Sequence, residues 1–268
     1  VFAPAILRAY DVRGVLNENL TVTDAYFLGR AFATLLKRRG GDSVCVGYDG
    51  RPSSPSRAQA LMAGLSASGM HVESLGLGPT PMTYFAIKDR LRDGGIMVTG
   101  SHNPPEYNGF KFMFQHGSFF GDAIQELGRI AAEGDLAPVL PAEQRGQVKD
   151  VDIKQDYLTR LFQDMAFPDA DLKMAWDCGI GATGEIVQEL VRDLPGTHHV
   201  LYAEIDGTFP NHHPDPTQLE NLRDLQNKVL QEKCHLGVAF DGDGDRIGVV
   251  DEKGEVIWGD RLMALFAR

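Results

Sequence analysis

The sequence alternates short runs rich in β-branched residues with longer amphipathic runs, and this alternation predicts an α/β fold. In the first half, strands are expected at 43–48, 71–75 and 95–99, and helices at 24–39, 56–68 and 83–91. In the second half, strands are expected at 173–178, 200–203 and 236–240, and helices at 185–194 and 219–232. Each half therefore predicts one βαβ-type domain, which a chain of 268 residues can accommodate.

The expected domain boundaries follow from composition. A polar stretch with Gly and Pro at 133–149 predicts a linker or a loose edge, so we expect a first domain over 1–148 and a second over 149–252. Residues 256–258 have the pattern of a strand, and a helix is expected to begin at Gly259 and Asp260, so 253–268 predict the beginning of a third domain. Because the chain begins with Val1 and ends inside this helix, we expect a fragment of a longer protein, truncated after the second domain.

Charge and composition limit the class of partner. The net charge of −11 argues against a nucleic-acid-binding surface, but arginines in a cleft can still bind an anionic small molecule. Without an apolar run of about 18 residues, a membrane-spanning helix is not expected. Cys45, Cys178 and Cys234 lack metal-ligand spacing and are expected to be buried free thiols, which suits the cytoplasm.

A serine follows the expected strand at 95–99. Ser101 stands between Gly100 and His102, prolines follow, and Lys111 comes ten residues later. A hydroxyl on a stiff, exposed turn, with a base and a cation nearby, suggests a nucleophile. The alternative is a surface turn that happens to carry a serine.

Three aspartates, Asp241, Asp243 and Asp245, alternate with glycines after the strand expected at 236–240. Residues two apart in an extended strand lie about 6.5–7 Å apart, whereas oxygen ligands at about 2.1 Å from Mg²⁺ must lie closer together, so the segment must curl. A solvated acidic turn is the alternative. An EF-hand is rejected because its sixth position is Arg246 and its flanks are strands. An aspartyl-phosphate phosphatase with Asp241 as nucleophile fits less well, since Asp245 replaces the Thr or Val of that motif.

A glycine loop, Gly179-Ile-Gly181-Ala-Thr-Gly184, follows a strand and opens a helix, with Glu204 about twenty residues further on. This pattern favours a rival hypothesis, an NAD-type dinucleotide-binding protein. The other interpretation is that the glycines only permit a tight turn and close packing between the strand and the helix.

Three motifs together resemble the α-D-phosphohexomutases, and most closely their bacterial phosphomannomutase/phosphoglucomutase branch. These motifs are residues 9–14, residues 99–104 with 108–111, and residues 241–246. Residues 105–110 and 209–216 favour that branch. The resemblance extends over essentially the whole chain and implies consecutive domains in which mixed sheets lie between layers of helices.

The resemblance also implies roles for individual residues. Ser101 would carry a phosphoryl group, and Asp241, Asp243 and Asp245 with an oxygen of that phosphate would hold one Mg²⁺. Lys111 and His102 would have acid/base and phosphate-orienting roles, and Arg13 would lie against the phosphate or the reacting hydroxyl. The remaining expected phosphate or substrate contacts are Tyr10, Asn103 and Arg246.

The implied reaction interconverts hexose 1-phosphate and hexose 6-phosphate, of mannose or glucose, through phosphoserine and a hexose 1,6-bisphosphate. Members of the family have four domains, and the third and fourth recognise the sugar and clamp its second phosphate. We therefore expect these 268 residues to bind Mg²⁺ but not to turn over hexose phosphates alone.

Overall fold

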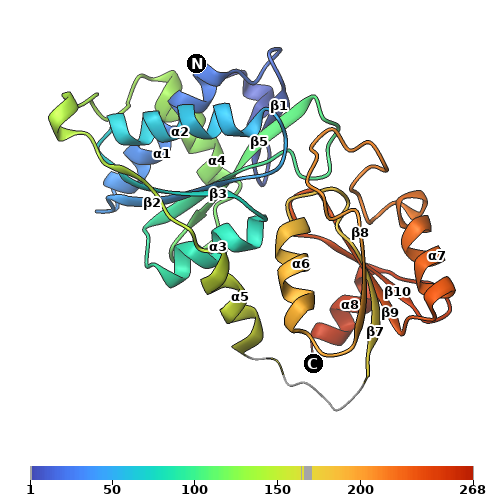
Figure 1. Cartoon of the computed structure of the whole chain (residues 1–268). Coiled ribbons are helices and arrows are strands. Elements are labelled where there is room, and N and C mark those ends of the chain that lie inside the picture. The colour runs from blue at the N-terminus through green and yellow to red at the C-terminus, as the bar shows by residue number, and fades with distance from the viewer. Residues whose placement is uncertain (1, 164, 166–170, 268) are drawn as a thin grey trace. The chain divides into compact units, whose positions relative to one another are not determined.

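The computed structural model describes residues 2–163, 165 and 171–267. Its contacts divide the chain into two compact units, Val1–Ile153 and Lys154–Arg268 (Figure 1). Each unit contains a mixed β-sheet with helices, so the expected α/β class with mixed sheets is confirmed. Among the described residues, no helix is both long and apolar enough to cross a bilayer.

The first unit is built on a six-stranded sheet in the order β1-β5-β4-β2-β3-β6. Strands β4, β2, β3 and the edge strand β6 are parallel, whereas β5 runs antiparallel to both β4 and β1. The strands are β1 (Val12–Val15), β2 (Ser43–Tyr48), β3 (His71–Leu77), β4 (Gly94–Val98), β5 (Tyr107–Phe114) and β6 (Val148–Asp150).

Strand β5 was not expected, because the glycines and prolines before it predict a loop. Its own residues explain it: Phe110, Phe112 and Phe114 alternate with more exposed positions and face the core. Strand β6 lies at the end of the stretch expected to be a linker, where it pairs with β3.

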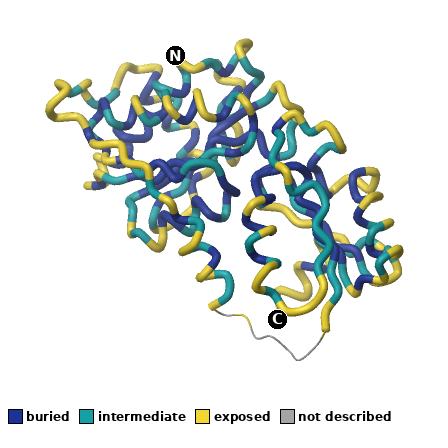
Figure 2. The backbone as a smooth tube through the Cα atoms, in the orientation of Figure 1, coloured by how far each residue is buried: buried dark blue, intermediate teal, exposed yellow. Residues whose placement is uncertain are grey.

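Helices cover both faces of this sheet. The core face packs against α1, α2 and α4, through residues such as Phe32, Leu61 and Leu127. On the opposite face lies α3, where Ile87 approaches Gly95 of β4. The helical segments are η1 (Pro4–Ile6), α1 (Val22–Lys37), α2 (Ser54–Ala67), α3 (Thr80–Asp89), α4 (Asp122–Ala132) and η2 (Ala142–Gln144). Figure 2 shows the buried backbone concentrated in the strands and in the helix faces that cover them.

Helix α1 begins earlier than expected. It starts at Val22 and not at 24, and Thr21 is its cap, because the Thr21 hydroxyl accepts a hydrogen bond from the Asp24 N–H at 3.2 Å. The Asp24 carboxylate in turn accepts the Thr21 N–H at 2.7 Å. This reciprocal pair satisfies two backbone donors that the first helical turn leaves free.

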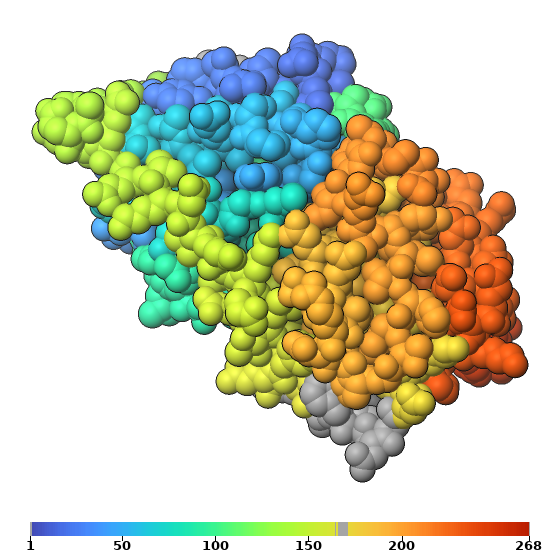
Figure 3. Space-filling model, viewed as in Figure 1, coloured from blue at the N-terminus to red at the C-terminus, as the bar shows by residue number. Residues whose placement is uncertain are grey.

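The second unit is built on a five-stranded sheet in the order β11-β10-β9-β7-β8. Its strands are β7 (Lys173–Asp177), β8 (Thr197–Leu201), β9 (Leu236–Phe240), β10 (Ile247–Asp251) and β11 (Val256–Ile257). Its helices are α5 (Lys154–Gln163), α6 (Gly184–Asp193), η3 (Leu219–Leu222), α7 (Arg223–Glu232) and α8 (Gly259–Phe266). In the space-filling view, the amber and orange segment from α6 to the loop after β8 forms much of the viewed surface of this unit (Figure 3).

A small core joins α7 to the sheet, where Leu225 and Val229 pack against Ala175 and Ala239. The helix expected at 219–232 begins as the 3-10 turn η3. The strand expected at 200–203 instead ends at Leu201, because Tyr202 takes a left-handed conformation with φ +53°. Strand β11 extends this sheet by pairing with β10, and the assignment of 253–268 to a further domain stays a prediction.

Candidate functional site: two loops at strand ends

Ser101 follows the carboxyl end of β4 and adopts a left-handed backbone conformation, with φ +50°. This conformation is uncommon for a residue with a Cβ and persists where surrounding groups enforce it. The Ser101 N–H donates to Thr99 Oγ1 at 2.8 Å, and its Oγ lies 3.3 Å from His102 Nδ1. Ser101 is buried, so the expectation of an exposed turn is wrong: the loop folds onto buried polar groups at the sheet edge.

The polar groups beneath this loop are Asp49 and Arg51, which are not among the residues predicted from the sequence. Both are buried, and they follow β2, the parallel neighbour of β4. The Asp49 carboxylate accepts the Gly100 N–H at 3.1 Å, and Arg51 Nη2 donates to the Ser101 carbonyl at 2.8 Å. Polar segments that follow two neighbouring parallel strands meet at the same end of the sheet. This pattern could have revealed Asp49 and Arg51.

The sheet register brings Arg13 and Lys111 close together. Arg13 pairs with Gly109 across β1 and β5, and Lys111 lies two residues further along β5, opposite Met97 of β4. Side chains in such a diagonal relation share a face, with Cβ atoms about 7–8 Å apart. Arg13 forms an ion pair with Asp11, and its buried Nε has no hydrogen-bond partner within the described part of the chain.

Asn103 and Tyr10 differ in environment. The Asn103 side chain donates to the Gly100 carbonyl at 3.1 Å and so closes the serine loop on itself. Tyr10 is 78% exposed and lies 6.3 Å from Phe120, ring centre to ring centre. Both rings line a cavity of about 590 Å³ in the first unit. The structure thus places Asn103 within the serine loop and Tyr10 on an aromatic surface.

The three aspartates form a hairpin loop between β9 and β10 in the second unit. Ligand oxygens of Asp241, Asp243 and Asp245 all lie within 4.8 Å of one another, and the first two residues are buried. Asp241 Oδ1 accepts the N–H groups of Asp245 and Arg246, both at 3.1 Å, which closes the curl. Converging carboxylate oxygens fit a hard divalent cation such as Mg²⁺ or Ca²⁺. Arg246 is exposed at the end of this loop.

The Gly179–Gly184 loop packs against the aspartate loop. A Cβ on Gly181 would lie 2.8 Å from the Gly242 carbonyl oxygen, and the Ala182 N–H donates to that oxygen at 2.9 Å. A Cβ on Gly184 would lie 1.9 Å from the Ala203 carbonyl oxygen. Close packing therefore accounts for both glycines.

The same loop offers little to a pyrophosphate, because a dinucleotide site needs backbone N–H groups that point at the ligand. Here the N–H of Gly179 donates to Asp177 Oδ1 at 2.9 Å, and that of Ile180 to the Tyr202 carbonyl at 3.0 Å. The Gly181 N–H donates to the Cys178 carbonyl at 2.9 Å. These bonds favour the packing interpretation over dinucleotide binding.

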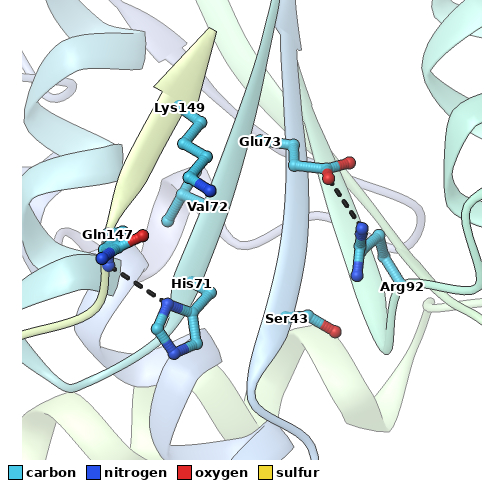
Figure 4. A pocket seen from close by; sticks show the side chains of 7 residues that line it. All are labelled: Ser43, His71, Val72, Glu73, Arg92, Gln147 and Lys149. Carbon is cyan, nitrogen blue, oxygen red and sulfur yellow. Dashed lines mark hydrogen bonds and ion pairs between the residues drawn. The ribbon is translucent and has the colours of Figure 1, made fainter. Parts of the chain in front are cut away.

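A pocket of about 170 Å³ lies at the other end of the strands of the first sheet, at the amino ends of β2 and β3 (Figure 4). Hydrogen bonds from Arg90 and Arg92 outweigh burial and lower the pKa of Glu73 to about 2. The charge of Glu73 is thus compensated within the protein. The residues that line this pocket are Ser43, His71, Val72, Glu73, Arg92, Gln147 and Lys149.

The three cysteines are buried and free, as expected. Burial is the largest cause that raises the pKa of Cys45 and of Cys178, each to about 12. Both therefore remain protonated near neutral pH and are poor nucleophiles. Neither the cysteines nor the pocket at the amino ends of β2 and β3 competes with the two loops as a candidate site.

Comparison with known proteins gives one consistent result. Residues 5–137 match the phosphoglucomutase/phosphomannomutase α/β/α domain I, and residues 155–254 match domain II of the same family. A phosphomannomutase/phosphoglucomutase of Pseudomonas aeruginosa is 44% identical over 98% of this chain, and a phosphoglucomutase of Neisseria gonorrhoeae is 40% identical over 98%.

A crystal structure of a phosphoglucomutase/phosphomannomutase family protein from Burkholderia thailandensis matches the whole chain, with a TM-score of 0.94 and 39% identity. The chain spans 59% of that structure and 56% of the length of the two relatives named above. The two domain models together cover most of the described residues of both units. The chain therefore belongs to the phosphoglucomutase/phosphomannomutase family and contains its domains I and II.

Proposed function

We propose that this chain is the phosphoserine- and metal-binding part of a phosphohexomutase, an isomerase that interconverts hexose 1-phosphate and hexose 6-phosphate. The observation that carries the proposal is the pair of loops in a chain of this family: a buried serine held in a left-handed conformation, and three aspartates whose oxygens converge. A nucleophile that needs a fixed direction and a site for a divalent cation are the two requirements of phosphoryl transfer.

In the proposed reaction, Ser101 begins as a phosphoserine. A free hydroxyl of the hexose phosphate attacks phosphorus, a new P–O bond to the sugar forms, and the bond to Ser101 Oγ breaks. The hydroxyl proton passes to Lys111 or His102, and from there to the departing Ser101 Oγ. After the hexose 1,6-bisphosphate reorients, Ser101 Oγ attacks the other phosphate, the bond from that phosphorus to the sugar oxygen breaks, and the Ser101 proton returns through Lys111 or His102 to the sugar oxygen. No oxidant or further reactant is required.

The metal-binding residues are proposed to be Asp241, Asp243 and Asp245, together with a phosphate oxygen on Ser101. When bound, Mg²⁺ would offset negative charge that develops on the transferring phosphoryl group. The carboxylate donor set supports this assignment, since Mg²⁺ prefers oxygen ligands.

The cationic contacts are proposed to come from Arg13 and Arg246. The Nε–H of Arg13 has no hydrogen-bond partner among the described residues and lies on the same sheet face as Lys111, which supports a role as a donor to phosphate or to the reacting hydroxyl. Tyr10 and Asn103 are proposed substrate or phosphate contacts. Since Asn103 donates to Gly100, its side-chain oxygen is the group more available to substrate.

The whole protein's substrates are proposed to be the phosphates of mannose, glucose or both, and its location the cytoplasm, which the three free thiols favour. Its further partners would be domains III and IV of a longer chain, in keeping with the 56% of relatives' length that these residues span. We expect these 268 residues alone not to complete the mutase reaction.

Phosphate mapping tests the proposal. The longer protein, with its proposed domains III and IV, is incubated with glucose 1,6-bisphosphate and Mg²⁺, and phosphopeptides are located by mass spectrometry. We expect one phosphoryl group on Ser101, absent in Ser101→Ala and present in the control Ser118→Ala. Acid-stable phosphate on Ser101 supports the mutase. Absence of phosphate from Ser101 contradicts it, and base-labile phosphate on Asp241 would instead favour an aspartyl-phosphate phosphatase.

A further inference from the structure

We propose that Arg51 is the positioning residue that fixes Ser101 for phosphoryl transfer, an inference that rests on the proposed function of Ser101. Arg51 is 1% exposed and lies beneath the serine loop, where it follows β2. A buried guanidinium is costly unless its charge and its donors are satisfied. The loop around Ser101 supplies the acceptors that make this burial possible.

All five N–H donors of the Arg51 guanidinium have an acceptor. Nη2 donates to the carbonyl oxygens of Ser101 at 2.8 Å and Asn103 at 2.6 Å. Nη1 donates to those of Pro104 at 2.7 Å and Tyr107 at 3.1 Å, and Nε donates to Asp49 Oδ2 at 3.2 Å. One planar group thus binds four carbonyls of residues 101–107 in a single geometry.

Asp49 balances the charge of Arg51 and ties it to the residue before the serine. Its carboxylate accepts the Thr99 hydroxyl at 2.8 Å and the Gly100 N–H at 3.1 Å. The Thr99 Oγ1 accepts the Ser101 N–H at 2.8 Å. Ser101 is therefore held at its N–H through Thr99 and Asp49, and at its carbonyl by Arg51.

Gly100 shows how closely the guanidinium approaches. A Cβ at this position would lie 2.4 Å from Arg51 Cζ, nearer than any real contact permits. The absence of a side chain at Gly100 lets the planar group lie against the backbone that leads into Ser101. Lysine cannot replace Arg51 here, because an ammonium group has three donors on one nitrogen and lacks the planar fork of the guanidinium.

These contacts explain the left-handed backbone of Ser101. With a Cβ, Ser101 at φ +50° is less stable than in the common regions, and the conformation persists only if neighbouring bonds determine it. Hydrogen bonds to the N–H and the carbonyl of the same residue fix its backbone and thereby the direction of its Oγ. Arg51 acts on the reaction through this geometry and not by contact with the substrate.

The test compares Arg51→Lys with Arg57→Lys. Arg57 is a second buried arginine of the same unit, and it donates to the carbonyls of Ser53 and Leu20. The rate of Ser101 phosphorylation by glucose 1,6-bisphosphate is measured against donor concentration in the longer protein that includes domains III and IV. Since a displacement of about 1 Å can cost about 100-fold, we expect a fall of that order in the maximal rate for Arg51→Lys. The half-saturating concentration should change little, and Arg57→Lys should match the wild type.

Hydrogen exchange of residues 99–108, read by mass spectrometry, separates this inference from the proposed function. Arg51→Lys should accelerate exchange in this segment and leave β1 and β3 protected. If wild-type Ser101 accepts no phosphate, the proposed function fails while exchange still tests Arg51. Unchanged rate and exchange in Arg51→Lys would overturn the positioning role. Should that variant not fold, Gly100→Ala displaces the Arg51 guanidinium from the loop, because the added Cβ would lie 2.4 Å from Arg51 Cζ. An unaltered rate and unaltered exchange in Gly100→Ala would overturn the positioning role equally.

Discussion

The serine loop and the aspartate loop reach a fixed geometry by opposite means. In the first unit, Ser101 is held from below by two buried charged side chains, Asp49 and Arg51. In the second, the aspartate loop is held by backbone against backbone, since Gly181 permits contact with Gly242. The first support depends on buried charges as well as on the glycine at position 100, and the second depends on a side chain being absent.

The difference follows from what each loop carries. The serine loop must fix one oxygen in a left-handed turn, and an arginine supplies many directional donors for that purpose. The aspartate loop concentrates three negative charges, so a further buried carboxylate beneath it would add repulsion. Close glycine packing supports it without adding charge. Substitutions in one loop should therefore leave the other intact.

The largest expected effect is on the charged support. Asp49→Asn keeps the shape but leaves the Arg51 charge buried without its partner, and we expect a loss of about 3–5 kcal/mol in the stability of the first unit. Asp93→Asn is the matched control, because Asp93 also accepts several hydrogen bonds, from Asp42 and from Ser43 at the start of β2, but is half-buried. Denaturant unfolding measures both. Equal losses would show that the charge of Asp49 has no special role.

The next effect concerns the metal. We expect Mg²⁺ at about 100 times its dissociation constant to stabilise the second unit by about 2.7 kcal/mol, and Asp243→Asn to abolish most of this gain. Asp251→Asn is the control, since Asp251 also accepts two backbone N–H groups in a hairpin, from Lys253 and Glu255. Thermal unfolding with and without Mg²⁺ gives the answer, and an undiminished gain in Asp243→Asn would refute the metal assignment.

The glycine support should respond to a single methyl group. Gly181→Ala places a Cβ 2.8 Å from a backbone oxygen, which cannot move as a flexible side chain would, and we expect about 1–3 kcal/mol of destabilisation. Mg²⁺ affinity by calorimetry should fall as the aspartate loop shifts. Gly259→Ala has open space around its Cβ and should behave as wild type. If both variants bind Mg²⁺ equally well, the glycine loop does not position the aspartates.

The smallest expected effect is pH-dependent and arises in the second unit. His212 Nε2 lies 3.1 Å from Asp177 Oδ2, and Nδ1 lies 3.0 Å from the His213 carbonyl, so both nitrogens face acceptors. Burial lowers the pKa of His212, but the hydrogen bond and charge of Asp177 outweigh burial and raise it above 6.5. The stabilisation is therefore complete below pH about 6.5 and is lost as pH rises through the folded-state pKa.

Unfolding free energies measured from pH 5.5 to 9 test this sign. The wild type should lose stability relative to His212→Gln as pH rises, and Asp177→Asn should remove the same pH-dependent difference while keeping the acceptor for the Gly179 N–H. A wild-type curve parallel to that of His212→Gln would show that the pair does not titrate in this range.

The sequence identifies the loops better than their supports. The aspartates are evident because three like charges alternating with glycines need a curl, and Ser101 is evident because it follows an apolar strand. Arg51 could not be recognised from its position in the chain alone, since a lone arginine after a strand is usually exposed. Its role depends on β2 and β4 being neighbours, which is a property of the sheet order. The burial of Ser101 was missed for the same reason, whereas β5 was missed because the glycines and prolines before it predict a loop.

Magnesium affinity before and after phosphorylation of Ser101 tests the central claim most directly, namely that both loops handle one phosphoryl group. If a phosphate oxygen on Ser101 joins the three aspartates around the metal, calorimetry should find tighter Mg²⁺ binding by the phosphorylated protein. That gain should vanish in Asp243→Asn. Equal Mg²⁺ affinity in the two phosphorylation states of the wild type would contradict the account.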